Sequence, residues 1–143
     1  MANDALFFVG QKAFIENDEG KLLVLFTPRG RVDLPGGKIQ EGEFDYRESL
    51  VREVREETGL EVAVGDPFMV WGLVLPDFHP DAGRTVFLVG YRCSFAGGEP
   101  AISDEHARYA WIGEEDLGVV SHEGAHFGAL EEYFRKRKPG LSR

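Results

Sequence analysis

Apolar residues along the chain fall into short runs that alternate with polar, Gly-rich or Pro-rich segments. Runs of Val, Leu, Ile and Phe that are bounded by turn-forming residues are typical of strands. They predict strands at residues 6–15, 21–26, 61–64, 68–75, 85–93 and 108–112. A turn at 17–20 joins the first two strands, and a polar loop at 76–84 precedes the fifth. The Gly- and Pro-rich segment 27–37 is expected to be a loop.

Two segments carry the signals of helices. Over residues 45–58, Asp45 and Glu48 resemble a capping box, and Gly59 supplies a C-terminal stop. Near residues 123–137, apolar residues recur at i, i+3 and i+7 and would share one face of a helix. Strands with helices at intervals predict an α/β or α+β fold with a mixed sheet between helices, while the strand order stays open.

Length and composition indicate one domain. The chain has 143 residues, of which 43% are hydrophobic and 29% charged, as is ordinary for a globular domain with a sizeable core. We therefore expect a single domain over 1–143. The sequence contains no apolar run of the roughly 18 residues that a membrane helix needs, and the N-terminal segment does not resemble a signal peptide. The single Cys93 cannot form an internal disulfide, and together these features predict a cytoplasmic protein outside the membrane.

The net charge of −9 argues against a nucleic acid as the main partner, because binding a polyanion requires a basic face. A small anionic substrate is compatible with this charge if acidic residues are clustered to hold divalent cations, which invert the local field. The positions of the acids along the chain are therefore informative.

Three acids lie close together on the predicted helix 45–58. At 100° per residue, Glu53, Glu56 and Glu57 share an arc of about 100°, next to the apolar arc that faces the core. Like charges at this spacing destabilise a helix by a few tenths of a kcal/mol each, and a divalent cation would relieve the repulsion. Oxygen ligands without Cys or His favour Mg²⁺ or Mn²⁺ over zinc. The alternative is a solvated acidic face, which is what most Glu-rich helices have.

A loop that precedes this helix adds further candidates. Gly36 and Gly37 allow close approach of the backbone and offer carbonyl oxygens, and Glu43 adds a fourth acid. Together the two segments resemble the Nudix box, in which Gly, Glu and an Arg-Glu-aliphatic-any-Glu-Glu-any-Gly-aliphatic block follow at fixed spacing. The specified positions are filled by Gly37, Glu43, Arg52, Glu53, Val54, Glu56, Glu57, Gly59 and Leu60. One departure is that eight residues, instead of seven, separate Glu43 from Arg52, which leaves the placement of Glu43 open.

The resemblance implies an α/β/α sandwich and a Mg²⁺-dependent hydrolase, with Mn²⁺ as a possible substitute. The substrate would be a nucleoside diphosphate linked to another moiety, cleaved at a phosphoanhydride bond. The implied metal ligands are Glu53, Glu56, Glu57 and the carbonyl of Gly37. The implied structural residues are Glu43, Gly59 and Arg52, which would orient Glu43 or Glu56.

Catalysis and substrate binding add further candidates. Glu57 is expected to be essential, and the general base is expected to be either Glu53 or Glu105 in the loop before strand 108–112. An exposed surface acid is the other interpretation of Glu105. Candidate substrate contacts flank the box or the 76–84 loop and are Arg29, Arg31, Lys38, Phe78 and Arg84, each of which is also compatible with an ordinary surface position.

The expected partner is a small-molecule nucleotide, bound by a monomer or homodimer. Pro76 follows Leu60 by sixteen residues, a spacing that resembles family members acting on ADP-ribose and favours this compound or a relative of it. The alternative enzyme is a pyrophosphohydrolase of ordinary or oxidised nucleoside triphosphates. A module that binds nucleotides without hydrolysis is the third hypothesis, although such modules usually lack some of the box carboxylates.

Overall fold

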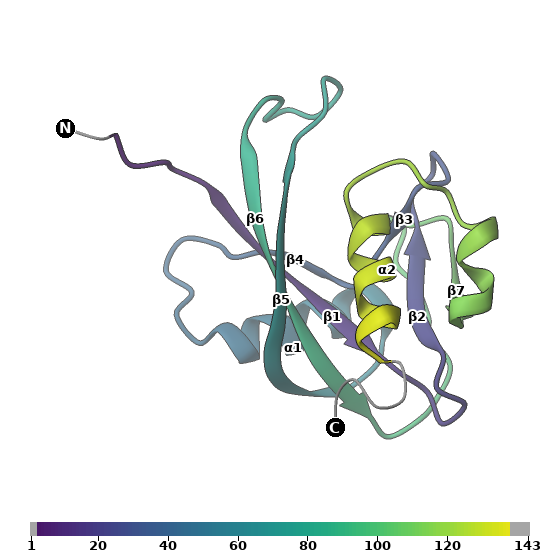
Figure 1. The fold of residues 1–143 in the computed structure, drawn as a ribbon. Coiled ribbons are helices and arrows are strands. Elements are labelled where there is room, and N and C mark those ends of the chain that lie inside the picture. Colours follow the sequence, from purple (N-terminus) through teal and green to yellow (C-terminus); the bar gives the residue numbers. More distant parts are fainter. Residues whose placement is uncertain (1–2, 138–143) are drawn as a thin grey trace.

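The structure is a computed structural model that describes residues 3–137 and contains two β-sheets (Figure 1). The larger sheet consists of β1 (Phe8–Ile15), β4 (Gly36–Lys38), β5 (Val62–Val74) and β6 (Thr85–Phe95). Its strand order is β4-β1-β6-β5, with β1 parallel to β6 and the other neighbours antiparallel. The smaller, antiparallel sheet has the order β3-β2-β7 and consists of β2 (Leu22–Phe26), β3 (Val32–Asp33) and β7 (Arg108–Ile112).

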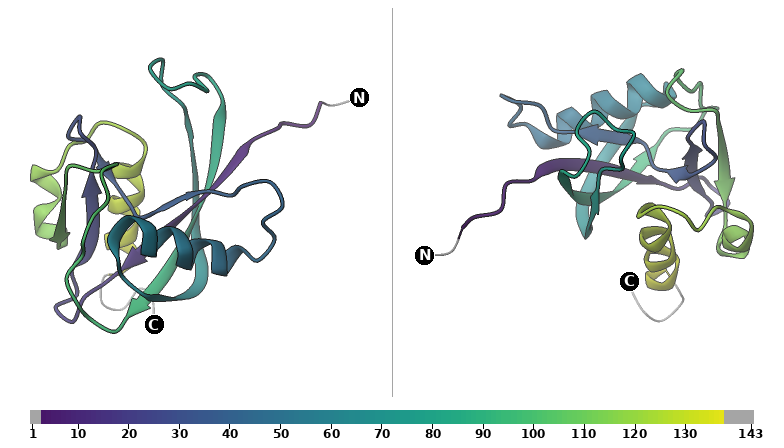
Figure 2. Two further views of the ribbon diagram at one scale, coloured as in Figure 1. Left: turned by 180° about the vertical axis from the view of Figure 1, so that it is seen from behind. Right: turned by 90° about the horizontal axis from the view of Figure 1, so that it is seen from above.

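Helices cover the sheets from two sides. They are α1 (Tyr46–Thr58), α2 (His126–Lys136) and the short 3₁₀ helix η1 (Glu114–Val119). Seen from above, the strands lie between α1 and α2 (Figure 2). The expected α/β/α arrangement with a mixed sheet is confirmed. Within residues 3–137, no helix has the length and apolar character needed to cross a membrane.

Strand β1 supplies side chains to both layers of the core. Successive side chains of a strand point to opposite faces. Ala13 and Ile15 accordingly pack with Leu50 of α1, while Phe14 belongs to the other cluster together with Tyr133 of α2. All five of these residues are buried. Burial of an Ile, Leu or Phe side chain stabilises the fold by about 1.5–3 kcal/mol, so the layers depend on this alternation.

The structure corrects several predicted boundaries. Segments 61–64 and 68–75 form the single strand β5, in which the pairing register shifts on both sides of Pro67. Proline cannot donate to a ladder and is tolerated because β5 is an edge strand. The predicted loop 27–37 contains β3 and most of β4, and the final helix begins at His126 instead of near 123.

Helix α1 begins and ends at the predicted caps. Asp45 accepts a hydrogen bond from the backbone N–H of Glu48 through its side chain, at 3.2 Å. At the other end, Gly59 has φ +74° and its N–H bonds to the carbonyl of Arg55 at 2.9 Å. This left-handed conformation is costly for residues with a Cβ atom. Gly59 therefore fixes where the helix stops and where the chain turns towards β5.

We predict that Gly59→Ala lowers the free energy of unfolding by about 1 kcal/mol, because alanine must adopt the left-handed conformation. Gly128→Ala is the matched control, since Gly128 lies inside α2 with no atom within 4 Å of an added Cβ. That variant should instead gain up to about 1 kcal/mol from helix propensity. Urea unfolding measures both, and an unchanged Gly59→Ala variant would contradict the capping role.

Candidate active site

Strand β4 lies directly against the C-terminal half of α1, and glycine makes this approach possible. A Cβ atom at Gly37 would lie 2.6 Å from Oε2 of Glu53, so any larger residue there would force that carboxylate to move. The backbone N–H of Gly36 donates to Oε1 of Glu57 at 2.8 Å. The backbone of β4 therefore touches two of the three glutamates that share one arc of the helix.

These three glutamates differ in burial. Glu57 is 8% exposed, whereas the side chains of Glu53 and Glu56 are 22% and 60% exposed. Burial raises the pKa of Glu57 to about 7. The Gly36 N–H and the charge of Lys12 favour the ionised form and partly offset this rise. A cation beside Glu57 would favour its carboxylate further.

Arg52 connects the acids of the box. Its Nη1 atom donates to Oε2 of Glu43 and its Nη2 atom to Oε1 of Glu53, both at 2.9 Å. Its Nε atom lies 3.8 Å from Oε2 of Glu56. Glu43 thus reaches Arg52 despite the additional residue between them, and the loop before α1 accommodates that residue. Oε1 of Glu43 also accepts the backbone N–H of Gln40 at 2.7 Å, which fixes the loop.

The residue set fits a hard divalent cation by its donor chemistry, since it offers carboxylate oxygens and the carbonyl of Gly37. The missing Cβ of Gly37 leaves room directly over Glu53. Among the described side chains, no group of three or more Asp, Glu, His or Cys is already arranged to hold a metal ion. Arg52 engages Glu53 and Glu56, so a complete set with Glu57 requires these two flexible side chains to rotate.

A cavity of about 440 Å³ opens beside α1 and β4. Four of the predicted site residues line it: Gly37, Lys38, Glu57 and Glu105. The β5–β6 hairpin adds an apolar wall of Leu73, Leu75, Val86 and Leu88. The cavity therefore joins a carboxylate-rich region to an apolar surface, which is the usual composition of a small-molecule site.

The structure places the other predicted substrate contacts outside this lining. The guanidinium carbon of Arg29 lies 3.8 Å from the ring centroid of Phe78, so these two residues contact each other across the 27–31 and 76–84 loops. Arg31 lies 3.8 Å from a carboxylate oxygen of Glu123. The guanidinium of Arg84 lies 5.8 Å from the centroid of the Phe8 ring, which Lys38 also approaches, at 4.7 Å.

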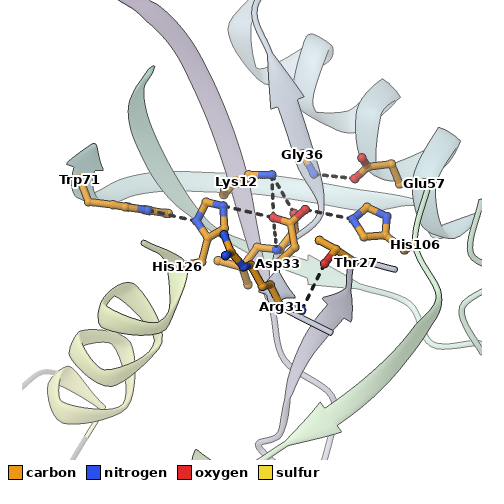
Figure 3. A network of polar contacts seen from close by, with 10 residues as sticks. Lys12, Thr27, Arg31, Asp33, Gly36, Glu57, Trp71, His106 and His126 are labelled. Atoms are coloured by element: carbon orange, nitrogen blue, oxygen red, sulfur yellow. Dashed lines mark hydrogen bonds and ion pairs between the residues drawn. The ribbon is translucent and has the colours of Figure 1, made fainter. Parts of the chain in front are cut away.

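A polar network forms another part of the cavity wall (Figure 3). At its centre, Asp33 lies 3.0 Å from Nζ of Lys12 and 3.0 Å from Nε2 of His106. Nε2 of His126 lies 3.3 Å from the same carboxylate. Nδ1 of His126 accepts the indole N–H of Trp71 at 3.2 Å, so the neutral ring carries its proton on Nε2, facing Asp33.

This network keeps Asp33 ionised inside the protein. Burial opposes its ionisation, but Lys12, His106 and His126 together hold its pKa well below the usual range of a carboxyl group. Burial and the charge of Lys12 lower the pKa of His126 to about 4. At neutral pH the network thus contains an ionised Lys12–Asp33 pair and a neutral His126.

Comparison with known proteins identifies the fold and the box together. The NUDIX domain model matches residues 7–133. The chain belongs to the Nudix family. A Mycobacterium tuberculosis protein named "Putative 8-oxo-dGTP diphosphatase 2" is 35% identical over 113 residues, which cover 74% of this chain and 70% of that protein. Taken together, the family and its named diphosphatase relatives make the chain a Nudix hydrolase.

Solved Nudix structures have the same architecture along nearly the whole chain. The MutT protein of Methanosarcina mazei Go1 superposes with a TM-score of 0.78 at 25% identity, covering 95% of this chain and 98% of that one. The ORF135 protein of E. coli superposes with a TM-score of 0.76 at 28% identity, covering 95% and 96%.

Sequence reasoning missed the network around Asp33. The signals were a Lys12 within an apolar strand and an Asp33 between Val32 and Leu34, because charged residues in apolar surroundings are usually paired. His126 is the first residue of α2, and nothing around it in the sequence indicates a partner. His106 follows Glu105 directly, in a segment whose pattern suggests a role only for the acid. The pairing of these residues depends on contacts between segments far apart in the chain.

We predict that Gly37→Ala lowers kcat/KM of this Nudix hydrolase by about 100-fold, because the added Cβ displaces the carboxylate of Glu53 and small misplacements in a site are expensive. Gly118→Ala is the matched control, since its Cβ would meet no atom within 4 Å. Thermal unfolding should show that both variants fold. Activity of Gly37→Ala within threefold of wild type would refute the close-contact account.

Proposed function

We propose that this Nudix hydrolase cleaves a nucleoside triphosphate to a nucleoside monophosphate and pyrophosphate in a Mg²⁺-dependent reaction. The observation that carries the proposal is the composition of the cavity. Gly37 and Glu57 form one part of its lining, and four apolar residues of the β5–β6 hairpin form another. Such a cavity suits a ligand with a charged phosphate chain and a flat, largely apolar base.

Divalent cations, when bound, neutralise charge on anhydride oxygens and lower the pKa of a coordinated water. Glu53, Glu56, Glu57 and the carbonyl of Gly37 would hold them. Arg52 contacts both Glu53 and Glu56, which would rotate from it to join Glu57, and Gly36 orients Glu57 through its N–H. Lys38, on the cavity lining, is positioned to contact phosphate oxygens. The protein thereby supplies both the ligands and their orientation.

We assign the general base to Glu105 in preference to Glu53. Glu53 is held by Arg52 and lies against Gly37, as a metal ligand should. Glu105 lines the cavity and forms no hydrogen bond or ion pair with any other residue between 3 and 137. Its carboxylate is thus free to take the proton of water as the water oxygen bonds to phosphorus and the anhydride P–O bond breaks.

The comparison favours triphosphates over ADP-ribose. The mycobacterial relative, at 35% identity, is named for a triphosphate substrate. The sequence clue for ADP-ribose was Pro76, and this proline is absent from the cavity lining, whereas its neighbour Leu75 belongs to it. ADP-ribose remains the second candidate because of that spacing. An apolar base wall is compatible with ordinary and oxidised purines alike.

A substrate panel tests the proposal. We expect Mg²⁺-dependent release of pyrophosphate from one or more ordinary or oxidised nucleoside triphosphates, and its loss in EDTA. Release of AMP and ribose phosphate from ADP-ribose would instead establish the second candidate. Metal-dependent turnover of neither class, with nucleotide still bound, would favour a binding module and overturn the proposal.

Glu57→Gln should lower kcat by more than about 100-fold, since even outer-shell partners of a metal are worth roughly 10–100-fold. The glutamine oxygen can still accept the Gly36 N–H, so the fold should be retained. Glu131→Gln, on the exposed surface of α2, is the matched control. Retention of most activity by Glu57→Gln would remove Glu57 from the ligand set.

Glu105→Gln should lower kcat by about 100-fold or more if its carboxylate removes the proton of water. KM should change little, because the amide preserves the size of the side chain. The measurement is steady-state kinetics on the triphosphate that the panel identifies. A loss below tenfold would return Glu105 to the class of exposed surface acids.

A further inference from the structure

The loop that carries Glu105 is tied down at both ends by backbone hydrogen bonds. The N–H groups of Ala101 and Ser103 donate to the carbonyls of Thr58 and Glu57 at 2.7 and 3.0 Å. Beyond the tip, the N–H of Ala107 donates to the carbonyl of Phe26 at 2.8 Å. The loop therefore spans from the end of α1 to β2. These bonds fix its ends, and at the tip, residues 104–106, the N–H of His106 donates to the carbonyl of Ser103 at 3.3 Å without tying the tip to the sheet.

A side chain fixes the tip. The imidazole of His106 is 5% exposed, and its Nε2 atom lies 3.0 Å from Oδ2 of Asp33. Asp33 is itself held by Lys12 and by the backbone N–H of Leu34 at 2.7 Å. The contact joins the tip to Asp33 of β3, and both residues line the cavity (Figure 3). Glu105, one residue away, has no such tether of its own.

We infer that His106 is a positioning residue that holds the carboxylate of Glu105 at the reacting water through its contact with Asp33. This inference rests on the proposed function. Planar peptide units and a spacing of about 3.8 Å between neighbouring Cα atoms transmit the position of the His106 backbone directly to Glu105. A catalytic group must be held within about 0.5 Å of its productive geometry, which an untethered loop tip cannot ensure.

The other contacts of the network show what His106 adds. Without His106, Asp33 would still contact Lys12, His126 and the backbone N–H of Leu34. The ionised state of Asp33 therefore does not depend on His106 alone. Nδ1 of His106 is buried and has no hydrogen-bond partner among the described residues. The imidazole therefore makes one hydrogen bond, and that bond ties the loop tip to the sheet.

The test compares three histidine variants in the full chain. His106→Leu removes the bond to Asp33. His106→Gln places an amide nitrogen as many bonds from Cβ as Nε2 of histidine and should restore the tether. His122→Leu is the matched control, because His122 packs on Phe127 and does not line the cavity. If His106→Leu does not fold, His106→Asn replaces it, since asparagine is polar but too short to span the contact.

We expect His106→Leu to lower kcat by about tenfold or more with KM within about twofold, because the base is misplaced while the substrate contacts remain. His106→Gln should recover most of kcat. In a Glu105→Gln background, His106→Leu should have less than about a threefold further effect, since residues that act through one another are not additive. Amide hydrogen exchange of residues 103–107 should accelerate in His106→Leu, while that of α1 should not.

Multiplicative losses of kcat in the double variant would overturn the inference and indicate a general structural role. Unchanged exchange in the 103–107 loop would overturn it as well, and this measurement needs neither metal nor substrate. Failure of the proposed function has a different signature, because wild-type protein would then hydrolyse no triphosphate. Hydrogen exchange would still decide whether His106 holds the loop.

Discussion

The contact between α1 and β4 is the constraint on which the site depends. Three glutamates on one helical arc repel one another. In the proposed site they bind a cation together with a backbone carbonyl, which requires backbone to approach them closely. Gly37 leaves the carboxylate of Glu53 in place, because a Cβ atom there would force it to move, and Gly36 donates its N–H to the buried Glu57. On its other side β4 pairs with β1, where Gly36 and Gly37 lie opposite Lys12 and Gln11. The acidic helix and the cavity wall are thus fixed by one short strand.

Charges buried around the cavity are compensated pairwise. Lys12 and Asp33 lie on β1 and β3, strands of different sheets, with side-chain exposures of 11% and 18%, and each would be expensive to bury alone. Two histidines complete the surroundings of Asp33 and connect β3 to the 101–107 loop and to α2. Hydrogen bonds and ion pairs of this kind, drawn from several segments, rigidify the wall of a cavity. In the proposed function, this rigid wall positions the loop that carries Glu105, the candidate base.

The sequence predicted the parts of this molecule that local patterns encode. The α1 boundaries, the capping by Asp45 and Gly59 and the complete Nudix box follow from spacing along the chain. The α/β/α layers and the mixed sheet were also predicted. Arg52 was expected to orient Glu43 or Glu56. The structure shows that it bonds to Glu43 despite the additional loop residue.

Features that depend on distant contacts were not predictable in this way. Strand β4 has only three residues, two of them glycine, and periodicity carries no signal over so short a run. Lys12, Asp33, His106 and His126 come from four segments, and only the tertiary fold brings them together. Arg29 and Phe78 were candidate substrate contacts or ordinary surface residues, and their packing on each other could not be read from their separate positions in the sequence.

The central claim is that the carboxylates of α1 hold the divalent cation that the reaction needs. The most direct measurement is the binding of Mn²⁺, followed by the electron paramagnetic resonance signal of the free ion. Wild-type protein should bind Mn²⁺ saturably, and the Glu53→Gln/Glu57→Gln double variant should bind it at least about tenfold more weakly with an unchanged circular dichroism spectrum. Equal affinity of the two proteins for Mn²⁺ would contradict the account.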